Sequence, residues 1–273
     1  MKIFIDSAKL EEIQEAYSYG IVDGVTTNPS LIKKAVDAQK KKVNMTTYIK
    51  QILRTAKGTP VSLEVTEFKY EKMVKQAKTL YKKFNPVAKN VCIKIPVNPS
   101  FDENSSMDGI KAIRTLSKSR IPVNCTLIFT PEQSLMAAKA GAKFVSPFVG
   151  RIDDYIKARN RIKSSKKDYF PAYGWHEHGR ILEDNGIISG IDLVKQTVEI
   201  FKQHKIKAKV LAASIRNIRQ LRESALVGAD IATIPFDVIK QSIVHYKTAE
   251  GMKKFTDDTI PEYVKITKEA KSS

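Results

Sequence analysis

Eight short apolar runs recur along the chain, and each is followed by a longer segment with helix-like spacing of apolar residues. The runs occupy residues 2–6, 24–28, 61–65, 91–97, 122–129, 144–149, 209–214 and 231–236. Short continuous apolar runs are typical of strands buried on both faces of a parallel sheet. Eight strands alternating with helices over about 250 residues predict an α/β fold, a (β/α)8 TIM barrel formed by residues 1–273 as a single domain.

Two of the helical segments begin with strong start signals. Asn28 is followed by Pro29, and proline suits the first helical turn. Thr130 is a capping residue followed by a proline and two acceptor side chains. An open doubly wound sheet is the alternative, but it needs a glycine-rich phosphate loop after an early strand, and the sequence has no G-x-G-x-x-G.

Three stretches depart from even barrel spacing. Residues 30–57 predict extra helices, and 248–273 predict a C-terminal helical tail outside the barrel or on a partner subunit. Residues 155–190 predict an insertion after strand six, on the catalytic-face side, as a lid or a subunit contact. It holds His176 and His178, which are two residues apart, but no third ligand is evident, so no metal site is predicted.

Composition and charge indicate a soluble protein with an anionic substrate. Hydrophobic residues make up 42% of the 273, and no apolar run approaches the roughly 20 residues that span a membrane. The first residues lack the apolar core of a signal peptide, so a cytoplasmic protein is expected. The net charge of +18 fits nucleic acid, an anionic surface or small anions. The lysines are dispersed without an aromatic and arginine cluster, which favours a lysine-rich compositional bias together with a phosphorylated substrate over a nucleic-acid role.

Polar residues gather near the carboxyl ends of the predicted strands, where a barrel has its catalytic face. They are Asp6, Thr26, Asn28, Glu64, Lys94, Asn124, Thr126 and Ser214, with Arg151 and Arg216 just after strands six and seven. Alternate strand residues face the lumen, so the neighbours Val25, Cys125 and Leu127 are expected to face the helices. Cys92 shares a face with Lys94, whereas Cys125 points the other way, so no disulfide is predicted.

Lys94 stands out because it interrupts an apolar run, and lysine is almost never fully buried without a partner or a role. In a mostly apolar barrel mouth, desolvation disfavours the ammonium and exposes a nucleophilic amine, which suits Schiff-base chemistry on a ketone. A purely structural lysine paired with Asp6 or Glu64 is the alternative. The ring of polar positions around the same barrel end favours a catalytic role.

Eight blocks in order resemble the transaldolase family: FIDSA, GVTTNPSLI, SLEVT, CIKIPV, NCTLIFTPEQ, VSPFVGRIDD, KVLAASIRN and IPFDVI. The resemblance covers nearly the whole chain except much of 155–190. It implies a (β/α)8 barrel that uses a Schiff-base lysine and no cofactor. It also implies transfer of a dihydroxyacetone unit between sugar phosphates, as in the pentose phosphate pathway.

The resemblance implies four catalytic residues. Lys94 would attack the ketose carbonyl and form the imine, which serves as the electron sink. Asp6 would take the proton from the C4 hydroxyl as the C3–C4 bond breaks. Glu64 and Thr126 would hold and activate a water for the proton transfers of imine formation.

The resemblance also implies the residues that bind substrate. Asn28 and Asn124 would bind hydroxyls of the three-carbon unit, with Thr26 in support. Ser214, Arg151 and Arg216 would grip the phosphate, in keeping with the bidentate preference of arginine. The assembly is expected to be a homo-oligomer of undefined size.

Two rival functions stay open. Fructose-6-phosphate aldolases resemble this chain and release free dihydroxyacetone, but they typically carry glutamine at the position of Glu64 and tyrosine at that of Phe148. A tyrosine hydroxyl could help to hydrolyse the imine, whereas phenylalanine cannot, so transaldolase is preferred. The second rival is a basic barrel that binds nucleic acid or an acidic partner without catalysis. The presence of Lys94, Asp6 and Glu64 argues against it.

Overall fold

Eight parallel strands close into a barrel. A computed structural model describes residues 1–38, 44–101, 106–163, 165 and 167–269. The strands are β1 (Lys2–Asp6), β2 (Gly24–Thr26), β3 (Val61–Glu64), β4 (Val91–Pro96), β5 (Val123–Ile128), β6 (Phe144–Pro147), β9 (Lys209–Ala212) and β10 (Ile231–Ile234). Their order around the barrel is β1-β10-β9-β6-β5-β4-β3-β2. Each predicted run contains one of these strands, and the predicted (β/α)8 barrel is confirmed.

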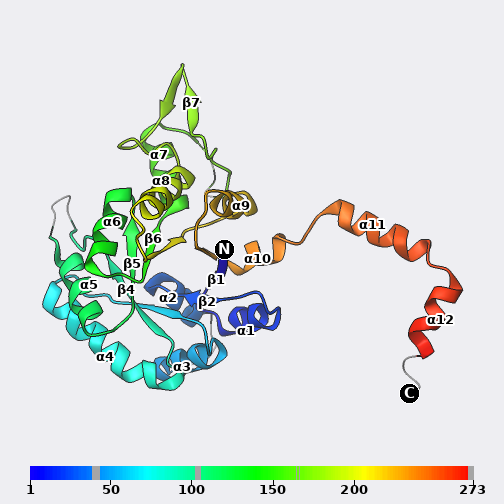
Figure 1. Cartoon of the computed structure of the whole chain (residues 1–273), viewed down its shortest axis with the longest axis horizontal. Helices are drawn as coiled ribbons and strands as arrows, with labels where there is room; N and C mark the ends of the chain where they lie inside the picture. The colour runs from blue at the N-terminus through cyan, green and yellow to red at the C-terminus, as the bar shows by residue number, and fades with distance from the viewer. Residues whose placement is uncertain (39–43, 102–105, 164, 166, 270–273) are drawn as a thin grey trace. The chain divides into compact units, whose positions relative to one another are not determined.

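Helices surround the strands (Figure 1). They are α1 (Leu10–Ser18), α2 (Pro29–Asp37), α3 (Met45–Thr55), α4 (Tyr70–Ala88), α5 (Asp108–Lys118), α6 (Pro131–Ala140), α7 (Val149–Arg159), α8 (Gly190–Gln203) and α9 (Ile218–Leu226). Helix α10 (Phe236–Gln241) follows β10 in the chain. The predicted start signals act as expected. The Asn28 side chain caps α2, and Thr130 forms a capping box with Gln133 at the start of α6.

The segment between β6 and β9 adds a small hairpin to the barrel. After α7 the chain forms the antiparallel strands β7 (Trp175–Glu177) and β8 (Arg180–Leu182), which project away from the barrel (Figure 1). The predicted insertion of residues 155–190 therefore begins inside helix α7 and contains this hairpin. Its role as a lid or a subunit contact stays a prediction.

The chain divides into two compact units, Met1–Val238 and Ile239–Ser273. The second unit contains α11 (Tyr246–Asp257) and α12 (Pro261–Glu269). The prediction that residues 1–273 form one domain stays a prediction. Over the described residues, no helix combines the length and the apolar composition needed to cross a membrane.

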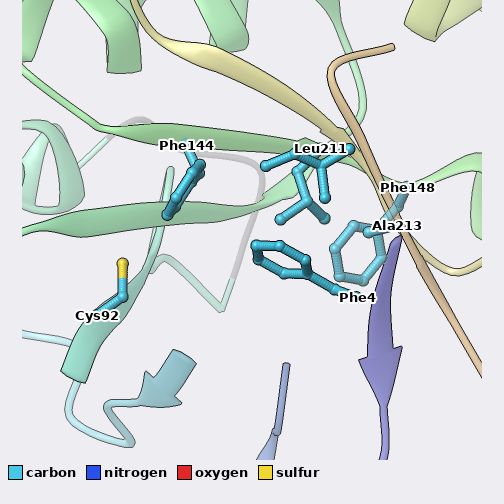
Figure 2. Packing of buried hydrophobic residues seen from close by; sticks show 7 residues of the cluster. Phe4, Cys92, Phe144, Phe148, Leu211 and Ala213 are labelled. Atoms are coloured by element: carbon cyan, nitrogen blue, oxygen red, sulfur yellow. The ribbon is translucent and has the colours of Figure 1, made fainter. Parts of the chain in front are cut away.

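An apolar cluster fills the barrel interior. It consists of Phe4, Cys92, Phe144, Phe148, Leu211, Ala213 and Ile231 (Figure 2). The Phe4 ring needs the space beside β2, because a Cβ on Gly24 would lie 2.7 Å from that ring. Asp6 follows Phe4 by two residues, and Lys94 follows Cys92 by two. Strand alternation therefore brings both polar side chains to the interior face, just above the apolar cluster.

A bulge in β5 corrects one prediction. Leu127 was expected to face the helices, but it packs against the interior cluster. Its φ is +56°, and the register between β5 and β6 shifts between Cys125 and Ile128. An extra residue in one strand breaks the alternation of side chains, so the face of Leu127 changes.

Candidate active site

Lys94 and Glu64 form a buried ion pair on neighbouring strands. The register between β3 and β4 places Glu64 directly beside Lys94. Lys94 Nζ lies 3.1 Å from Glu64 Oε2, and the two side chains are only 7% and 14% exposed. A buried charge needs a partner, and this pair supplies one for each member. The amine therefore lies fixed inside the barrel mouth with a carboxylate next to it.

Asp6 faces the same space from β1. Its carboxylate accepts a hydrogen bond of 2.7 Å from Thr26 Oγ1, on the adjacent strand β2. Burial raises the pKa of Asp6, while the positive charge of Lys94, the Thr26 hydrogen bond and the charge of Arg151 oppose that shift. A carboxyl whose pKa lies above its ordinary value is better suited to take up and return a proton near neutral pH.

Strand β5 contributes Asn124 and Thr126. Asn124 lies beside Lys94 in the strand register, and its amide is held by Ser62 (3.2 Å) and Ser146 (2.7 Å). Thr126 Oγ1 is buried and has no hydrogen-bond partner among the described residues. Such an orphaned buried hydroxyl calls for an explanation, and a bound water or substrate group would provide one.

One pocket joins most of the predicted residues at the carboxyl ends of the strands. It is lined by Asp6, Thr26, Asn28, Lys94, Ser146, Phe148, Arg151, Leu211, Ala213, Ser214 and Thr233. Glu64, Asn124, Thr126 and Arg216 were also predicted, but they do not line it. Glu64 lies behind Lys94 as its ion-pair partner, and Asn124 lies beside Lys94 in the strand register.

Phe148 lies close to both cations of this pocket. Its ring centroid is 5.9 Å from Lys94 Nζ and 5.1 Å from Arg151 Cζ. The face of an aromatic ring attracts cations, so Phe148 helps to set the positions of both. The pocket thus holds an amine and a guanidinium, both close to one aromatic ring.

Ser214 takes up the left-handed conformation directly after β9, with φ +58°. Its carbonyl accepts a hydrogen bond from the Gly150 amide in the first turn of α7, and the Ala213 carbonyl accepts one from the Val149 amide. These bonds fix the loop after β9 against the amino end of α7. Ser214 and Arg151 therefore meet at a positively polarised helix end, which favours an anion.

Arg216 forms a forked ion pair that the sequence did not reveal. Its Nη1 and Nη2 atoms donate to the two carboxylate oxygens of Asp154, at 2.5 and 2.6 Å. Arg216 lines a second pocket beside the first, and Arg151 lines both. One sequence signal pointed to Asp154 as a site residue. It lies three residues after Arg151 on α7, and residues with this spacing share one helix face.

Three further polar residues were missed by sequence reasoning. Ser62 and Ser146 hold Asn124, and Thr233 lies 2.5 Å from Thr26, hydroxyl to hydroxyl. Each occupies a strand position two residues from another interior residue. The alternation of side chains along the strand could therefore have placed them in the barrel interior. Across the described part of the chain, no group of three or more His, Cys, Asp or Glu side chains gathers around a possible metal position.

Comparisons with known proteins identify the family of this chain. The family described as Transaldolase/Fructose-6-phosphate aldolase matches residues 3–272. A protein named probable transaldolase from Thermoplasma acidophilum is 41% identical over 94% of this chain and 95% of its own length. Proteins of the same name from Chlorobaculum parvum and Caldicellulosiruptor saccharolyticus are each 41% identical over 94% of this chain, and over 97% and 96% of their own lengths. The chain belongs to the transaldolase/fructose-6-phosphate aldolase family of enzymes.

Proposed function

We propose that the protein is a cytoplasmic transaldolase of the pentose phosphate pathway. It moves a dihydroxyacetone unit from sedoheptulose 7-phosphate or fructose 6-phosphate to glyceraldehyde 3-phosphate or erythrose 4-phosphate. The observation that carries this proposal is the buried Lys94, 3.1 Å from Glu64, in a pocket that it shares with Asp6 and Arg151.

The first step is imine formation on Lys94. Lys94 gives its ammonium proton to Glu64, the resulting amine attacks the C2 carbonyl of the ketose, and the carbinolamine then loses water. Glu64 supplies a carboxylate 3.1 Å from the amine for the proton transfers that this loss requires. The orphaned hydroxyl of Thr126 is suited to hold the water that leaves and later returns.

The second step breaks the C3–C4 bond. Asp6 takes the proton of the C4 hydroxyl, the aldose phosphate leaves, and the electron pair moves into the imine to give an enamine on Lys94. Asp6 then returns the proton when the enamine attacks an acceptor aldehyde. Water finally hydrolyses the imine and frees the product ketose and the Lys94 amine.

Phosphate recognition is assigned to Arg151 and Ser214. Both line the pocket that contains Lys94, and Arg151 lies in the first turn of α7. Asn28 and Asn124 are the candidates for the hydroxyls of the three-carbon unit, with Thr26 beside Asp6. Arg216 acts from the adjoining pocket, where Asp154 holds its guanidinium.

Direct release of dihydroxyacetone is the rival reaction. A lyase must hydrolyse the three-carbon imine without waiting for an acceptor. The Phe148 ring lies 5.9 Å from the Lys94 amine and carries no hydroxyl that could protonate the intermediate. This feature supports transfer over release.

The test measures free dihydroxyacetone from fructose 6-phosphate, with and without erythrose 4-phosphate. The proposal expects little dihydroxyacetone without the acceptor, and rapid formation of sedoheptulose 7-phosphate with it. Release at the same rate in both tubes would assign the lyase reaction instead. Absence of both products would contradict the proposal.

A homo-oligomer remains part of the proposal. The second unit exposes large apolar side chains, among them Ile243, Tyr246 and Phe255, and α11 has no buried residue. Exposed apolar groups of this density are typical of surfaces that bind another protein. Light scattering of the full chain and of residues 1–238 tests whether the assembly depends on this unit. A full-length protein that stays monomeric would contradict the proposed homo-oligomer.

A further inference from the structure

Thr233 lies in the pocket without a role in the proposed reaction. It is on β10, is 3% exposed and lines the same space as Asp6 and Lys94. Its hydroxyl oxygen is 2.5 Å from Thr26 Oγ1, and that oxygen is in turn 2.7 Å from Asp6 Oδ1. Strands β2 and β10 are the two neighbours of β1, so the three side chains come from adjacent strands, and their hydrogen bonds join them in a row with Thr26 in the middle.

The direction of these hydrogen bonds follows from counting protons. An ionised carboxylate can only accept, so Thr26 must donate its single hydroxyl proton to Asp6. Thr26 then has no proton left for Thr233, and Thr233 must donate to Thr26. The row is therefore a directed chain that runs from Thr233 through Thr26 to Asp6.

We propose that Thr233 is a positioning residue that orients the Thr26 hydroxyl toward Asp6 and so stabilises the ionised carboxylate that accepts the substrate proton. The inference rests on the proposed function. A hydroxyl that itself accepts a hydrogen bond is a stronger donor, so the bond from Thr233 strengthens the one that Asp6 receives. Without it, the Thr26 hydroxyl is free to rotate away.

The surroundings of Asp6 allow the hydrogen bonds from Thr233 through Thr26 to contribute measurably to the stability of the ionised carboxylate. The charged groups that act on Asp6 are Lys94 from β4 and Arg151 from α7, and both favour its ionised form against burial. The strands that pair with β1 contribute no titratable side chain, because β2 reads GVT and β10 reads IATI. Loss of the Thr233 hydroxyl therefore changes one influence on Asp6 and leaves the charges in place.

The test is the pH profile of kcat/KM for three variants at this position. Thr233→Val removes the hydroxyl and keeps the side-chain shape, Thr233→Ala is the second variant without a hydroxyl, and Thr233→Ser restores the donor. The acidic limb is expected to move to higher pH by about half a unit to one unit in the Val and Ala variants. It should return to the wild-type position in the Ser variant.

Thr197→Val is the matched control. Thr197 is also fully buried, and its hydroxyl donates to the Leu193 carbonyl within α8, away from the pocket. A general loss of packing or stability should affect this variant as much as Thr233→Val. Its acidic limb should stay at the wild-type position.

A second readout separates this inference from the proposed reaction. Carbon NMR of the Asp6 carboxyl titrates the group directly, whether or not turnover is detected. If the pKa of Asp6 rises in Thr233→Val while the wild type shows no transferase activity, the hydrogen-bond chain is supported and the proposed function is contradicted. An active wild type whose Asp6 titration and acidic limb are unchanged in Thr233→Val and Thr233→Ala would overturn the inference.

Discussion

The guanidinium of Arg216 is held by both oxygens of Asp154, at 2.5 and 2.6 Å, in a pair that joins the loop after β9 to helix α7. The approach is close because residue 150 is glycine, and a Cβ there would lie 2.7 Å from Arg216 Nε. The Arg216 amide also donates to the Gln220 side chain. Arg216 is therefore held in place by the protein itself, and such preorganisation would lower the entropic cost of binding the phosphate that we propose for it.

Removal of the Asp154 carboxylate is expected to weaken phosphate binding. Asp154→Ala should raise KM for fructose 6-phosphate about tenfold and change kcat less, which corresponds to about 1.4 kcal/mol of lost positioning. Steady-state kinetics with fructose 6-phosphate measure the change in KM, and inhibition by inorganic phosphate measures phosphate binding. Glu199→Ala, which removes an exposed ion pair on α8, is the control. Tighter inhibition by phosphate in Asp154→Ala would contradict this role, because it would mean that Asp154 only competes with the substrate phosphate for the Arg216 guanidinium.

Thr126→Val is expected to lower activity without lowering stability. The Thr126 hydroxyl is buried and has no partner among the described residues, so its loss removes no protein hydrogen bond and a desolvation cost disappears. The melting temperature should stay unchanged or rise, while kcat falls by about tenfold or more. Thr126→Ser keeps the hydroxyl and should retain activity. Full activity in Thr126→Val would exclude a role for this hydroxyl in proton transfer.

Phe148→Tyr is expected to shift the reaction toward release of free dihydroxyacetone. The new hydroxyl would enter a pocket in which the ring lies 5.9 Å from the Lys94 amine, where it can help to protonate and hydrolyse the imine. Phe129→Tyr is the control, because Phe129 packs edge-on against Phe148 at 5.8 Å but lines the second pocket and not the one around Lys94. Acceptor-independent release is the measurement. Equal release in both variants would contradict this reasoning.

Asp153 is expected to make stability fall as pH rises. Burial raises its pKa to about 7, although its carboxylate accepts hydrogen bonds from the Gly190 amide and from Gln220. Between about pH 4 and pH 7 the folded state keeps a proton that the unfolded state has released, so the unfolding free energy decreases across that window.

Urea denaturation at pH 5 and pH 8 measures the effect of Asp153. The wild type should lose on the order of 2 kcal/mol relative to Asp153→Asn between these values. Asp153→Asn is the control for the wild type, because it has no carboxyl group that can titrate at this position. A parallel pH dependence of the two proteins would show that Asp153 is already ionised at pH 5.

Local sequence pattern was sufficient to predict the barrel. Each strand is a short apolar run, and the capping residues Asn28 and Thr130 mark where helices begin. Every strand except β1 ends one or two residues earlier than predicted, and two of these ends have a clear cause. The chain leaves β2 after Thr26 so that Asn28 can cap α2, and it leaves β9 before Ser214 takes up a left-handed conformation. Such ends depend on turn geometry, which periodicity does not contain.

The site was predictable only where it follows strand alternation. Asp6, Thr26 and Lys94 face one pocket, as the alternation implies. The bulge at Leu127 reverses the alternation locally, and nothing in the run VNCTLI marks it. The pairs that complete the site join residues far apart in sequence, as Arg216 and Asp154 do across 62 positions. Only the folded chain brings them together.

The central claim is that Lys94 forms an imine with a ketose phosphate. Borohydride reduction in the presence of fructose 6-phosphate, followed by intact mass and peptide mapping, tests it directly. Lys157 is an internal control, because it is equally buried at 6% exposure but lies outside the pocket around Asp6. We expect a three-carbon adduct on the peptide that contains Lys94 and none on the peptide that contains Lys157. An adduct elsewhere, or no adduct in a protein that still transfers dihydroxyacetone, would contradict the account.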